Sequence, residues 1–192
     1  MRNILKLGIF LLVVAGVAGL ALSYVNTLTE PIVISQEQEN KINSFKEVYP
    51  EAETVKDESS KYLKSDEQKI ITEVNVAYKN GNPVGVIYTV EPKGYAGAVR
   101  TLVGFDIAAK KITAIKVLSQ KETPGLGAKS SEASFMDRFK GKSAESAVEI
   151  IKKEPVNGNQ VLAITAATIT SKAVASGVNA AREHFIANFV KS

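Results

Sequence analysis

An uninterrupted apolar stretch near the amino terminus constrains this chain more than any other feature. Residues Leu7 to Tyr24 read LGIFLLVVAGVAGLALSY and contain no charged side chain. As a helix, such a stretch is just long enough to cross the roughly 30 Å hydrocarbon core of a bilayer. We therefore predict a transmembrane helix. The N-terminal residues and this helix form the first part of the chain, residues 1–26.

Charged residues on either side of this stretch predict its orientation. Arg2 and Lys6 precede it, whereas Glu30, Glu37 and Glu39 follow it. Because positively charged flanks are retained on the cytoplasmic side, we expect a cytoplasmic N-terminus, a single pass, and an extracytoplasmic domain beyond about residue 26.

A cleaved signal peptide is the alternative interpretation of the same stretch. Ala21 and Ser23 form a small-x-small pattern that a signal peptidase could accept. The apolar run is, however, longer than the roughly 7 to 15 residues usual for the core of a signal peptide. The sequence favours a retained anchor and leaves cleavage open.

Composition narrows the chemistry that the chain can perform. Its 24 basic and 20 acidic residues are scattered, with no basic stripe carrying interleaved aromatic residues, which argues against nucleic-acid binding. There is no Cys and a single His, so disulfides, thiol nucleophiles and multi-histidine metal sites are excluded, and we expect no metal site. We interpret His184 as a packing or surface residue of the last helix. Any electron transfer would require a bound organic cofactor.

Behind the apolar stretch, residues 35–50 have the pattern of an amphipathic helix that Pro50 is expected to end. The next residues, EAETVKDESSKYLKSDEQK at 51–69, are charged and poorly periodic, and we interpret them as a surface linker. We expect a helix and connecting segment over residues 27–69. The apolar side chains that recur at helical spacing are Ile42, Phe45, Val48 and Tyr49.

From residue 70 onward the apolar spacing changes to two, the period of a β-strand. The run ITEVNVAYKNGNPVGVIYTVEP contains two β-rich stretches around residues 80–83, which predicts a hairpin. The stretches AVRTLVGFD and KITAIKVLSQ, joined by IAAK, extend the pattern. The sequence therefore predicts an antiparallel sheet of at least four strands.

Two helices are predicted after these strands. The first covers about Glu132 to Phe139, and the last begins near Thr170 or Ser171, either of which could cap it. We expect residues 70–192 to form one α+β domain, an antiparallel sheet packed with helices behind one N-terminal transmembrane helix. The apolar stripe that would place the last helix on the sheet consists of Val174, Val178, Ala181, Phe185 and Phe189.

A glycine-containing loop, KETPGLGAK at 121–129, follows the last predicted strand. Pro124 followed by Gly125 suits a type II turn, so a tight connection is one interpretation. In the other, its two glycines let the backbone approach a planar or phosphorylated ligand closely. The candidate binding residues in this loop are Glu122, Thr123, Gly125, Leu126 and Gly127.

Two further segments allow both a structural and a functional interpretation. In KGYAGAVR, Gly94 and Gly97 flank Tyr95, and a strand entry or bulge would explain both glycines. In ITAATITSKAV, residues 164–174, hydroxyls gather at the expected helix start, where free N–H groups and the helix dipole favour a phosphate. Plain capping needs only one of them, and the four are Thr165, Thr168, Thr170 and Ser171.

In this order behind an apolar helix, GYAGAVRTLVGFD, KETPGLGAK and ITAATITSKAV resemble the FMN-binding domain family. The resemblance spans almost the whole chain, and KETPGLG is its most specific part. Within the family, the chain most resembles subunits of Rnf-type ion-translocating oxidoreductase complexes. Subunits of sodium-translocating NADH:quinone reductases are relatives.

The family's flavin attachment pattern is D-x-x-[ST]-G-A-T, in which FMN is joined through its phosphate to the final Thr. The resemblance assigns that role to Thr168, preceded by Thr165, Ala166 and Ala167. Two positions depart from the pattern, because Leu162 replaces Asp and Ala166 replaces Gly. The first removes a carboxylate available to a flavin transferase. If the second position requires a positive φ, its methyl group costs about 1 kcal/mol or more.

The resemblance implies a membrane-anchored electron carrier on the outer face of a bacterial inner membrane. A separate flavin transferase would attach FMN to Thr168, and electrons would pass between this flavin and the other membrane subunits of the complex. The chain would be a subunit of an enzyme rather than an enzyme by itself. The alternative is a structural or assembly subunit of the same complex with no covalent flavin, which Leu162 and Ala166 favour.

Overall fold

The computed structural model describes residues 2–63 and 70–190, and the chain divides into two units, Met1–Asn43 and Ser44–Ser192. Helix α1, Arg2–Val48, makes up the described part of the first unit and its last residues belong to the second. Within the described part of the chain, Lys6–Glu30 is the one segment long and apolar enough to cross a membrane. The helix expected up to Pro50 is confirmed, as a continuation of the apolar helix that ends at Val48. Of its expected apolar stripe, Phe45, Val48 and Tyr49 are buried, whereas Ile42 is exposed.

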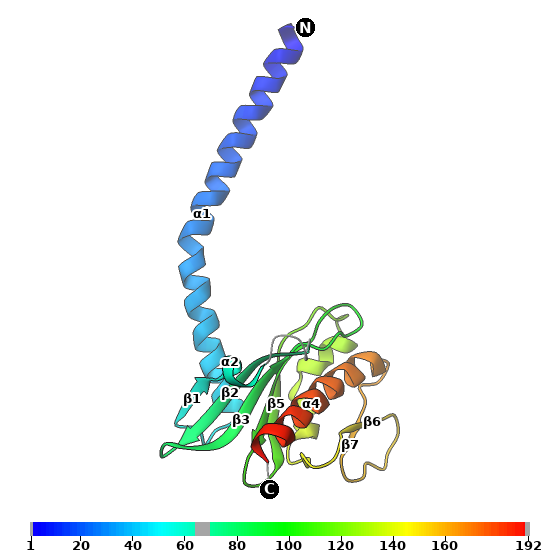
Figure 1. Ribbon diagram of the computed structural model, residues 1–192. Coiled ribbons are helices and arrows are strands. Elements are labelled where there is room, and N and C mark those ends of the chain that lie inside the picture. Colours follow the sequence, from blue (N-terminus) through cyan, green and yellow to red (C-terminus); the bar gives the residue numbers. More distant parts are fainter. Residues whose placement is uncertain (1, 64–69, 191–192) are drawn as a thin grey trace. The chain divides into compact units, whose positions relative to one another are not determined.

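A five-stranded antiparallel sheet in the order β1-β2-β3-β4-β5 forms the centre of the second unit (Figure 1). The predicted hairpin is confirmed, and its turn is tighter than expected. Asn80 and Gly81 both have positive φ, 52° and 76°, as a two-residue type I′ turn requires. The strands are β1 Thr54–Asp57, β2 Ile71–Lys79, β3 Asn82–Val90, β4 Arg100–Asp106 and β5 Lys111–Ser119.

Strand β1 corrects the expectation that residues 51–69 form a linker. Its backbone pairs with β2, from Thr54 opposite Tyr78 to Asp57 opposite Asn75. As an edge strand it leaves three of its four side chains exposed, so no alternation of apolar and polar residues marks it in the sequence. The end of the expected linker, residues 64–69, lies outside the described residues.

Short elements connect the sheet to the final helix. The helix predicted over 132–139 is present as one α-helical turn followed by a 3-10 turn, whereas the parallel pair β6 and β7 was not predicted. These elements are α2 Ser59–Tyr62, η1 Gly127–Ser131, α3 Ala133–Met136, η2 Asp137–Phe139, β6 Glu149–Ile151, β7 Gln160–Leu162 and α4 Thr168–Phe189.

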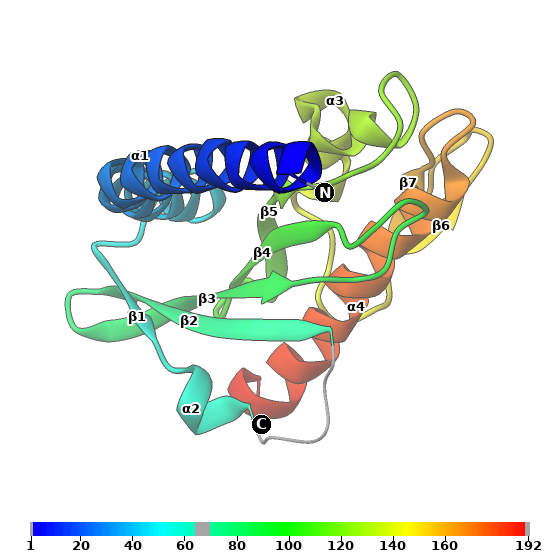
Figure 2. The ribbon, with the colours of Figure 1, turned by 90° about the horizontal axis from the view of Figure 1, so that it is seen from above.

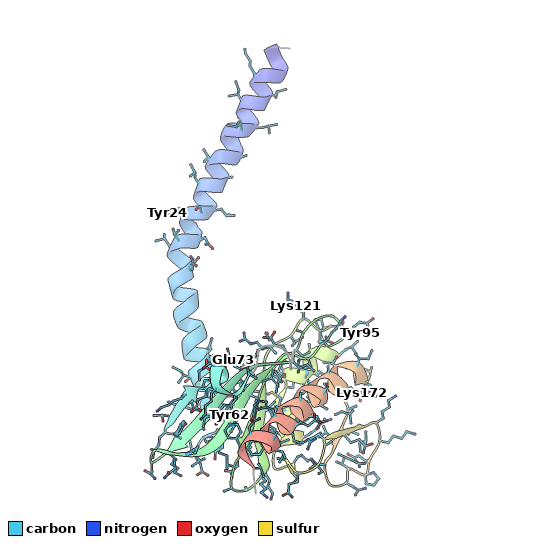
Figure 3. All side chains as sticks on the ribbon, viewed as in Figure 1. Tyr24, Tyr62, Glu73, Tyr95, Lys121 and Lys172 are labelled. Atoms are coloured by element: carbon cyan, nitrogen blue, oxygen red, sulfur yellow. The ribbon has the colours of Figure 1, made fainter. Side chains whose placement is uncertain are left out.

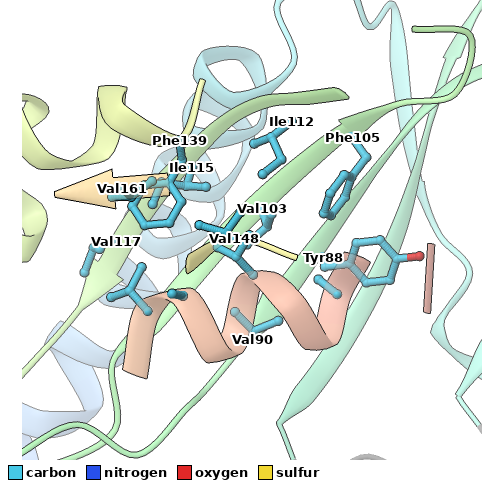
Figure 4. Packing of buried hydrophobic residues seen from close by; sticks show 14 of the residues in the cluster. Tyr88, Val90, Val103, Phe105, Ile112, Ile115, Val117, Phe139, Val148 and Val161 are labelled. Atoms are coloured by element: carbon cyan, nitrogen blue, oxygen red, sulfur yellow. The ribbon is translucent and has the colours of Figure 1, made fainter. Parts of the chain in front are cut away.

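Helix α4 lies across one face of the sheet, as Figure 2 shows from above. The predicted apolar stripe is confirmed, because Val174, Val178, Ala181 and Phe185 are buried in the main core and Phe189 packs against its edge. Figure 4 shows the strand side chains that fill this core beneath the helix. The same interior holds His184, which confirms its packing role: its Nδ1 lies 3.0 Å from the Tyr88 hydroxyl and its Nε2 lies 3.2 Å from the Tyr62 carbonyl.

The opposite face of the sheet is covered by a smaller cluster that includes Phe45 and Val48 from the end of α1 and Tyr49, which follows the helix. Two glycines allow this close packing. A Cβ at Gly85 would overlap the Tyr49 ring, and one at Gly104 would meet a Val48 methyl group at 2.5 Å. The sheet is thus held on both faces, which gives the loops at its end a rigid base.

Candidate functional site

Three loops meet at the end of the sheet where α4 begins (Figures 1 and 2). They are the connection between β3 and β4, the loop that follows β5, and the segment that leads from β7 into α4. Together they enclose a cavity of about 540 Å³. Its walls are formed by Tyr95, Glu122, Thr123, Leu126, Gly127, Ala166, Ala167, Thr168, Ile169 and Thr170.

The Glu122 carboxylate joins the three loops. One of its oxygens accepts the backbone N–H groups of Tyr95 and Ala96, each at 2.9 Å. The other accepts the Thr170 hydroxyl at 2.5 Å. Only 7% of Glu122 is exposed, so this charge is buried and fully engaged by the protein. Glu122 thus holds the walls of the cavity together and is itself part of the lining, and its expected contact with a ligand stays a prediction.

The charge of Glu122 is stabilised by these contacts. Burial by itself would raise the pKa of the carboxyl. The hydrogen bonds from Thr170 and from the amides of Ala96, Tyr95 and Gly97 outweigh burial and hold the pKa below its ordinary value. Glu122 is therefore ionised at neutral pH.

Two glycines make room for this carboxylate. A Cβ at Gly94 would lie 2.6 Å from Glu122 Oε1, and a Cβ at Gly127 would lie 2.5 Å from Oε2 and 2.7 Å from the Thr170 hydroxyl. These glycines are thus required by close approach of protein groups. The strand-entry interpretation of Gly94 misses this contact, because Glu122 is distant in sequence.

The predicted turn at Pro124 is also confirmed. The Leu126 amide donates to the Thr123 carbonyl at 3.1 Å, and Gly125 has φ 77°, as the third position of a type II turn requires. The turn leaves Thr123, Leu126 and Gly127 on the cavity wall, while Gly125 lies outside it.

The structure separates the four hydroxyls around the start of α4 into two pairs. Thr170 donates to Glu122, and the Ser171 hydroxyl donates to the Ala167 carbonyl while accepting the Ile164 amide at 2.9 Å. The prediction that Thr170 or Ser171 caps the helix is therefore wrong. Helix α4 begins at Thr168, and its N-cap residue Ala167 provides no side-chain cap.

The other pair, Thr165 and Thr168, is not engaged in this way. Among the described residues, none forms a hydrogen bond with either hydroxyl. Thr168 is half-buried and lines the cavity, whereas Thr165 is exposed and lies outside the lining. Since the first amides of a helix have no partner within it, the Thr168 hydroxyl lies beside free N–H donors.

The two departures from the attachment pattern differ in their surroundings. Ala166 lines the cavity with φ 62°, which confirms that this position needs the left-handed conformation that glycine adopts freely. Leu162, in contrast, is not part of the cavity lining. Its carbonyl accepts a hydrogen bond from Arg138 at 2.7 Å. The missing carboxylate therefore leaves the cavity wall unchanged.

Two residues of the cavity wall were missed as site residues from the sequence. Tyr95, 72% exposed, was noted only for its position between two glycines (Figure 3). Ile169 is 56% exposed and lies off the buried stripe of α4. A single exposed apolar side chain does not mark a site. Ile169 is therefore recognised only once the fold places it on one cavity wall with Tyr95 and Leu126.

A family model described as the FMN-binding domain matches residues 94–183, which contain the loop after β5, the segment that leads into α4 and most of the connection between β3 and β4. Over 93% of its length the chain is 36% identical to the G subunit of the Na⁺-translocating ferredoxin:NAD⁺ oxidoreductase complex of Acetobacterium woodii, and it covers 89% of that protein. Over 56% of each chain it is 40% identical to the G subunit of the proton-translocating ferredoxin:NAD⁺ oxidoreductase complex of Clostridium ljungdahlii.

Solved structures share the fold. The C subunit of the Na⁺-translocating NADH-quinone reductase from Parabacteroides distasonis superposes with a TM-score of 0.53 and is 29% identical, over 62% of this chain and 63% of that one. NqrC of Shewanella oneidensis gives 0.55 at 20% identity, over 62% and 61%, and supports the fold alone. This chain spans less than two thirds of either solved chain.

Proposed function

The chain belongs to the family of G subunits of ion-translocating Rnf-type oxidoreductase complexes, and from that premise we propose that it relays electrons through an FMN covalently bound to Thr168. One observation carries the proposal. Thr168 combines a hydroxyl that no described residue engages, a place on the cavity wall and the first position of a helix. The neighbouring hydroxyl of Thr170 is occupied by Glu122.

The cavity fits a flavin in size and chemistry. Its volume of about 540 Å³ lies in the range of small-molecule sites, roughly 300 to 1,000 Å³. Gly127 brings backbone to the wall where a side chain would collide with Glu122, and Leu126, Ala167 and Ile169 supply apolar surface for a planar ring. The loop KETPGLG would hold the ring, with the Thr123 hydroxyl available as a hydrogen-bonding group.

The start of α4 fits the phosphate. Because Ala167 provides no side-chain cap, the first amides of the helix remain available to an anion. The positive end of the dipole of a 22-residue helix adds a favourable field there. A phosphate ester at Thr168 would lie next to these donors. Thr165 and Ala166 would shape the approach to it.

The chain's own residues bind and orient the cofactor. FMN, when bound, supplies one-electron and two-electron transfer, and the protein determines its orientation and surroundings. Glu122 fixes the three loops relative to one another and places a negative charge in the cavity wall. Thr168 serves as a tether. Covalent attachment would prevent loss of the cofactor from a compartment that cannot replace it.

The partners and topology follow from the same proposal. Electrons would reach the flavin from other membrane subunits of the complex and leave toward another cofactor. A flavin transferase would form the ester during maturation. Lys6–Glu30 would anchor the chain in the cell membrane, with the cavity on the extracytoplasmic side, as the charges flanking the helix favour.

A structural or assembly subunit without covalent flavin remains the second candidate, because Ala166 is strained and Leu162 lacks a carboxylate. Mass mapping of the chain from its native host decides between them. The tryptic peptide Glu154–Lys172 is expected to carry FMN, and fragmentation is expected to place it on Thr168.

Two substitutions provide the matched test. Thr168→Ala should abolish the ultraviolet fluorescence of the denatured protein band, while Thr54→Ala, at an exposed position of β1 outside the cavity lining, should leave it unchanged. Covalent flavin that survives Thr168→Ala would refute the attachment site. An unmodified wild-type peptide, from a host that flavinylates its other targets, would favour the structural subunit.

A further inference from the structure

Exposed apolar side chains line the cavity, and exposed basic side chains lie within two residues, along the sequence, of its lining residues. We define this set as the rim, made up of apolar Tyr95, Leu126 and Ile169 and basic Lys93, Lys121, Lys129 and Lys172. We propose that the rim docks an acidic surface of a partner protein that exchanges electrons with this site. The inference rests on the proposed function, because it names the partner of the same site.

The apolar part of the rim is larger than isolated surface residues would give. Tyr95 is 72% exposed, Ile169 56% and Leu126 41%, and all three line one cavity although they come from three different loops. Exposed apolar groups gathered around one opening are typical of a contact surface. Tyr is moreover enriched among the residues that dominate protein interfaces.

Among residues 2–63 and 70–190, the basic part of the rim has no acidic counterpart. All four lysines are exposed, and within the described part of the chain no carboxylate pairs with any of them. Figure 3 shows Lys121, Lys172 and Tyr95 at this end of the domain.

The acidic residues that lie close in sequence to the rim are already engaged. Glu122 is buried and hydrogen-bonded, Glu91 pairs with Arg100 at 3.2 Å, and Glu132 accepts the Ser134 hydroxyl at 3.3 Å. The cofactor would not neutralise the rim either, because a phosphate diester carries a single negative charge. Several unpaired lysines therefore remain around the opening when the site is loaded.

This arrangement favours a protein partner with carboxylates around an apolar centre. An apolar patch with a charged, solvent-accessible border is the general anatomy of protein interfaces. Complementary charge raises association rates by about tenfold to a thousandfold and makes them depend on salt. A contact that must form and separate at each electron transfer benefits from steering of this kind.

Zero-length cross-linking tests the proposal directly. A water-soluble carbodiimide joins a lysine to a carboxylate only where the two already touch, so it would be applied to native membranes holding the whole complex. Peptide mapping should then find rim lysines, and Lys121 or Lys172 in particular, joined to Asp or Glu of another subunit. The yield should fall several-fold when ionic strength is raised from about 0.05 M to about 0.5 M.

A set of variants isolates the charge of the rim. In K121Q/K129Q/K172Q, Lys93 remains as the reporter, and its cross-link yield should fall about tenfold. The matched control is K152Q/K153Q, which removes two exposed lysines from the connection between β6 and β7, more than ten residues in sequence from any residue of the cavity lining, and should leave the yield unchanged. The single variant K172Q should lower the yield less, and serves if the triple variant is poorly produced.

The cross-linking results test the rim independently of whether Thr168 carries flavin. Cross-links from Lys152 and Lys153 but none from the rim would overturn the proposal. So would rim cross-links to a second copy of this chain, or a yield that salt and K121Q/K129Q/K172Q leave unchanged. Flavin on the Thr168 peptide is measured in the same digests, so an unmodified peptide would refute the proposed function while the cross-links still report on the rim.

Discussion

The two ends of helix α4 meet different surroundings. Toward its carboxyl end, Phe185 is fully buried and stacks on Phe105 with ring centroids 4.8 Å apart, and His184 is hydrogen-bonded to Tyr88. At its amino end the helix has no side-chain cap, follows Ala166 with a positive φ and leaves Ile169 exposed.

This difference separates stability from function along one helix. The packed end contributes free energy of folding through burial. The other end leaves a hydroxyl, free amides and apolar surface available to a ligand, each of which is unfavourable or neutral for folding alone. The packed end can hold the strained end in place, because both belong to one continuous helix. Substitutions at the two ends of α4, and in the loop that packs against its start, test that separation.

Removing the buried ring at the packed end should cost the most. Phe185→Ala is expected to lower the free energy of unfolding by about 3–5 kcal/mol, because it leaves a cavity against Phe105. The matched control at the other end is Ile169→Ala, expected to stay within about 0.5 kcal/mol. Denaturant unfolding of the full chain in detergent gives both values. Equal losses would show that the two ends do not differ in the way described.

Glu122 should matter to both stability and the site. In Glu122→Gln, the side-chain N–H₂ would face either the Thr170 hydroxyl or the Tyr95 and Ala96 amides, which are all donors. We therefore expect the free energy of unfolding to fall by about 1.5–3 kcal/mol and the flavin to be retained more weakly. The exposed Glu132→Gln is the control and should change neither quantity. If Glu122→Gln leaves both unchanged, the carboxylate does not hold the loops together.

The same carboxylate predicts a pH dependence. Its pKa in the folded state lies below the ordinary value of 4.5, so the ionised form is stabilised by folding. The contribution of the ionised carboxylate to the free energy of unfolding is complete above pH 4.5. It is lost as the pH falls through the lower pKa of the folded state. The difference in unfolding free energy between wild type and Glu122→Gln should therefore be constant near neutral pH and shrink in acid. A difference that grows in acid would mean that folding raises the pKa of Glu122, which would contradict this prediction.

The hydrogen bond beneath the packed end should have an intermediate effect. Tyr88→Phe removes the hydroxyl beside His184 Nδ1 in a fully buried setting and is expected to cost about 1–2 kcal/mol. Tyr95→Phe, at an exposed position, is the control and should be neutral in an unfolding titration. If Tyr88→Phe is equally neutral, His184 does not depend on this contact.

The smallest effect is expected at Ala166, with the opposite sign. Its left-handed conformation costs about 1–2 kcal/mol, and glycine would remove that cost while losing about 0.4–1 kcal/mol through the unfolded state. Ala166→Gly should therefore raise the unfolding free energy by up to about 1 kcal/mol. Ala175→Gly, inside α4, should lower the unfolding free energy by about 1 kcal/mol. A loss in both variants would contradict the strain at Ala166.

Local patterns in the sequence were sufficient for most of the fold. Alternating residues predicted β2 to β5, and Asn80–Gly81 predicted the turn that joins the first two. The apolar stripe of α4 predicted its buried face. These features succeed because strand and helix periodicity place side chains on one face whatever surrounds them.

Elements stabilised from outside were missed or misplaced. Strand β1 carries an exposed, charged sequence and is held by its backbone pairing with β2. Helix α4 starts earlier than expected because the hydroxyls of Thr170 and Ser171 bond to Glu122 and to the Ile164 and Ala167 backbone instead of capping it. Such partners depend on contacts that no local pattern records.

The sequence by itself determined the apolar anchor segment, the class of fold and the three loops that carry the site. It also indicated, through the family resemblance, that Ala166 occupies a position suited to glycine. Only the tertiary structure decided which hydroxyls remain available, because that depends on where the Glu122 carboxylate lies. A buried charge is costly unless hydrogen bonds compensate it. The Glu122 carboxylate therefore accepts the Thr170 hydroxyl, whereas Thr168 lines the cavity with its hydroxyl available.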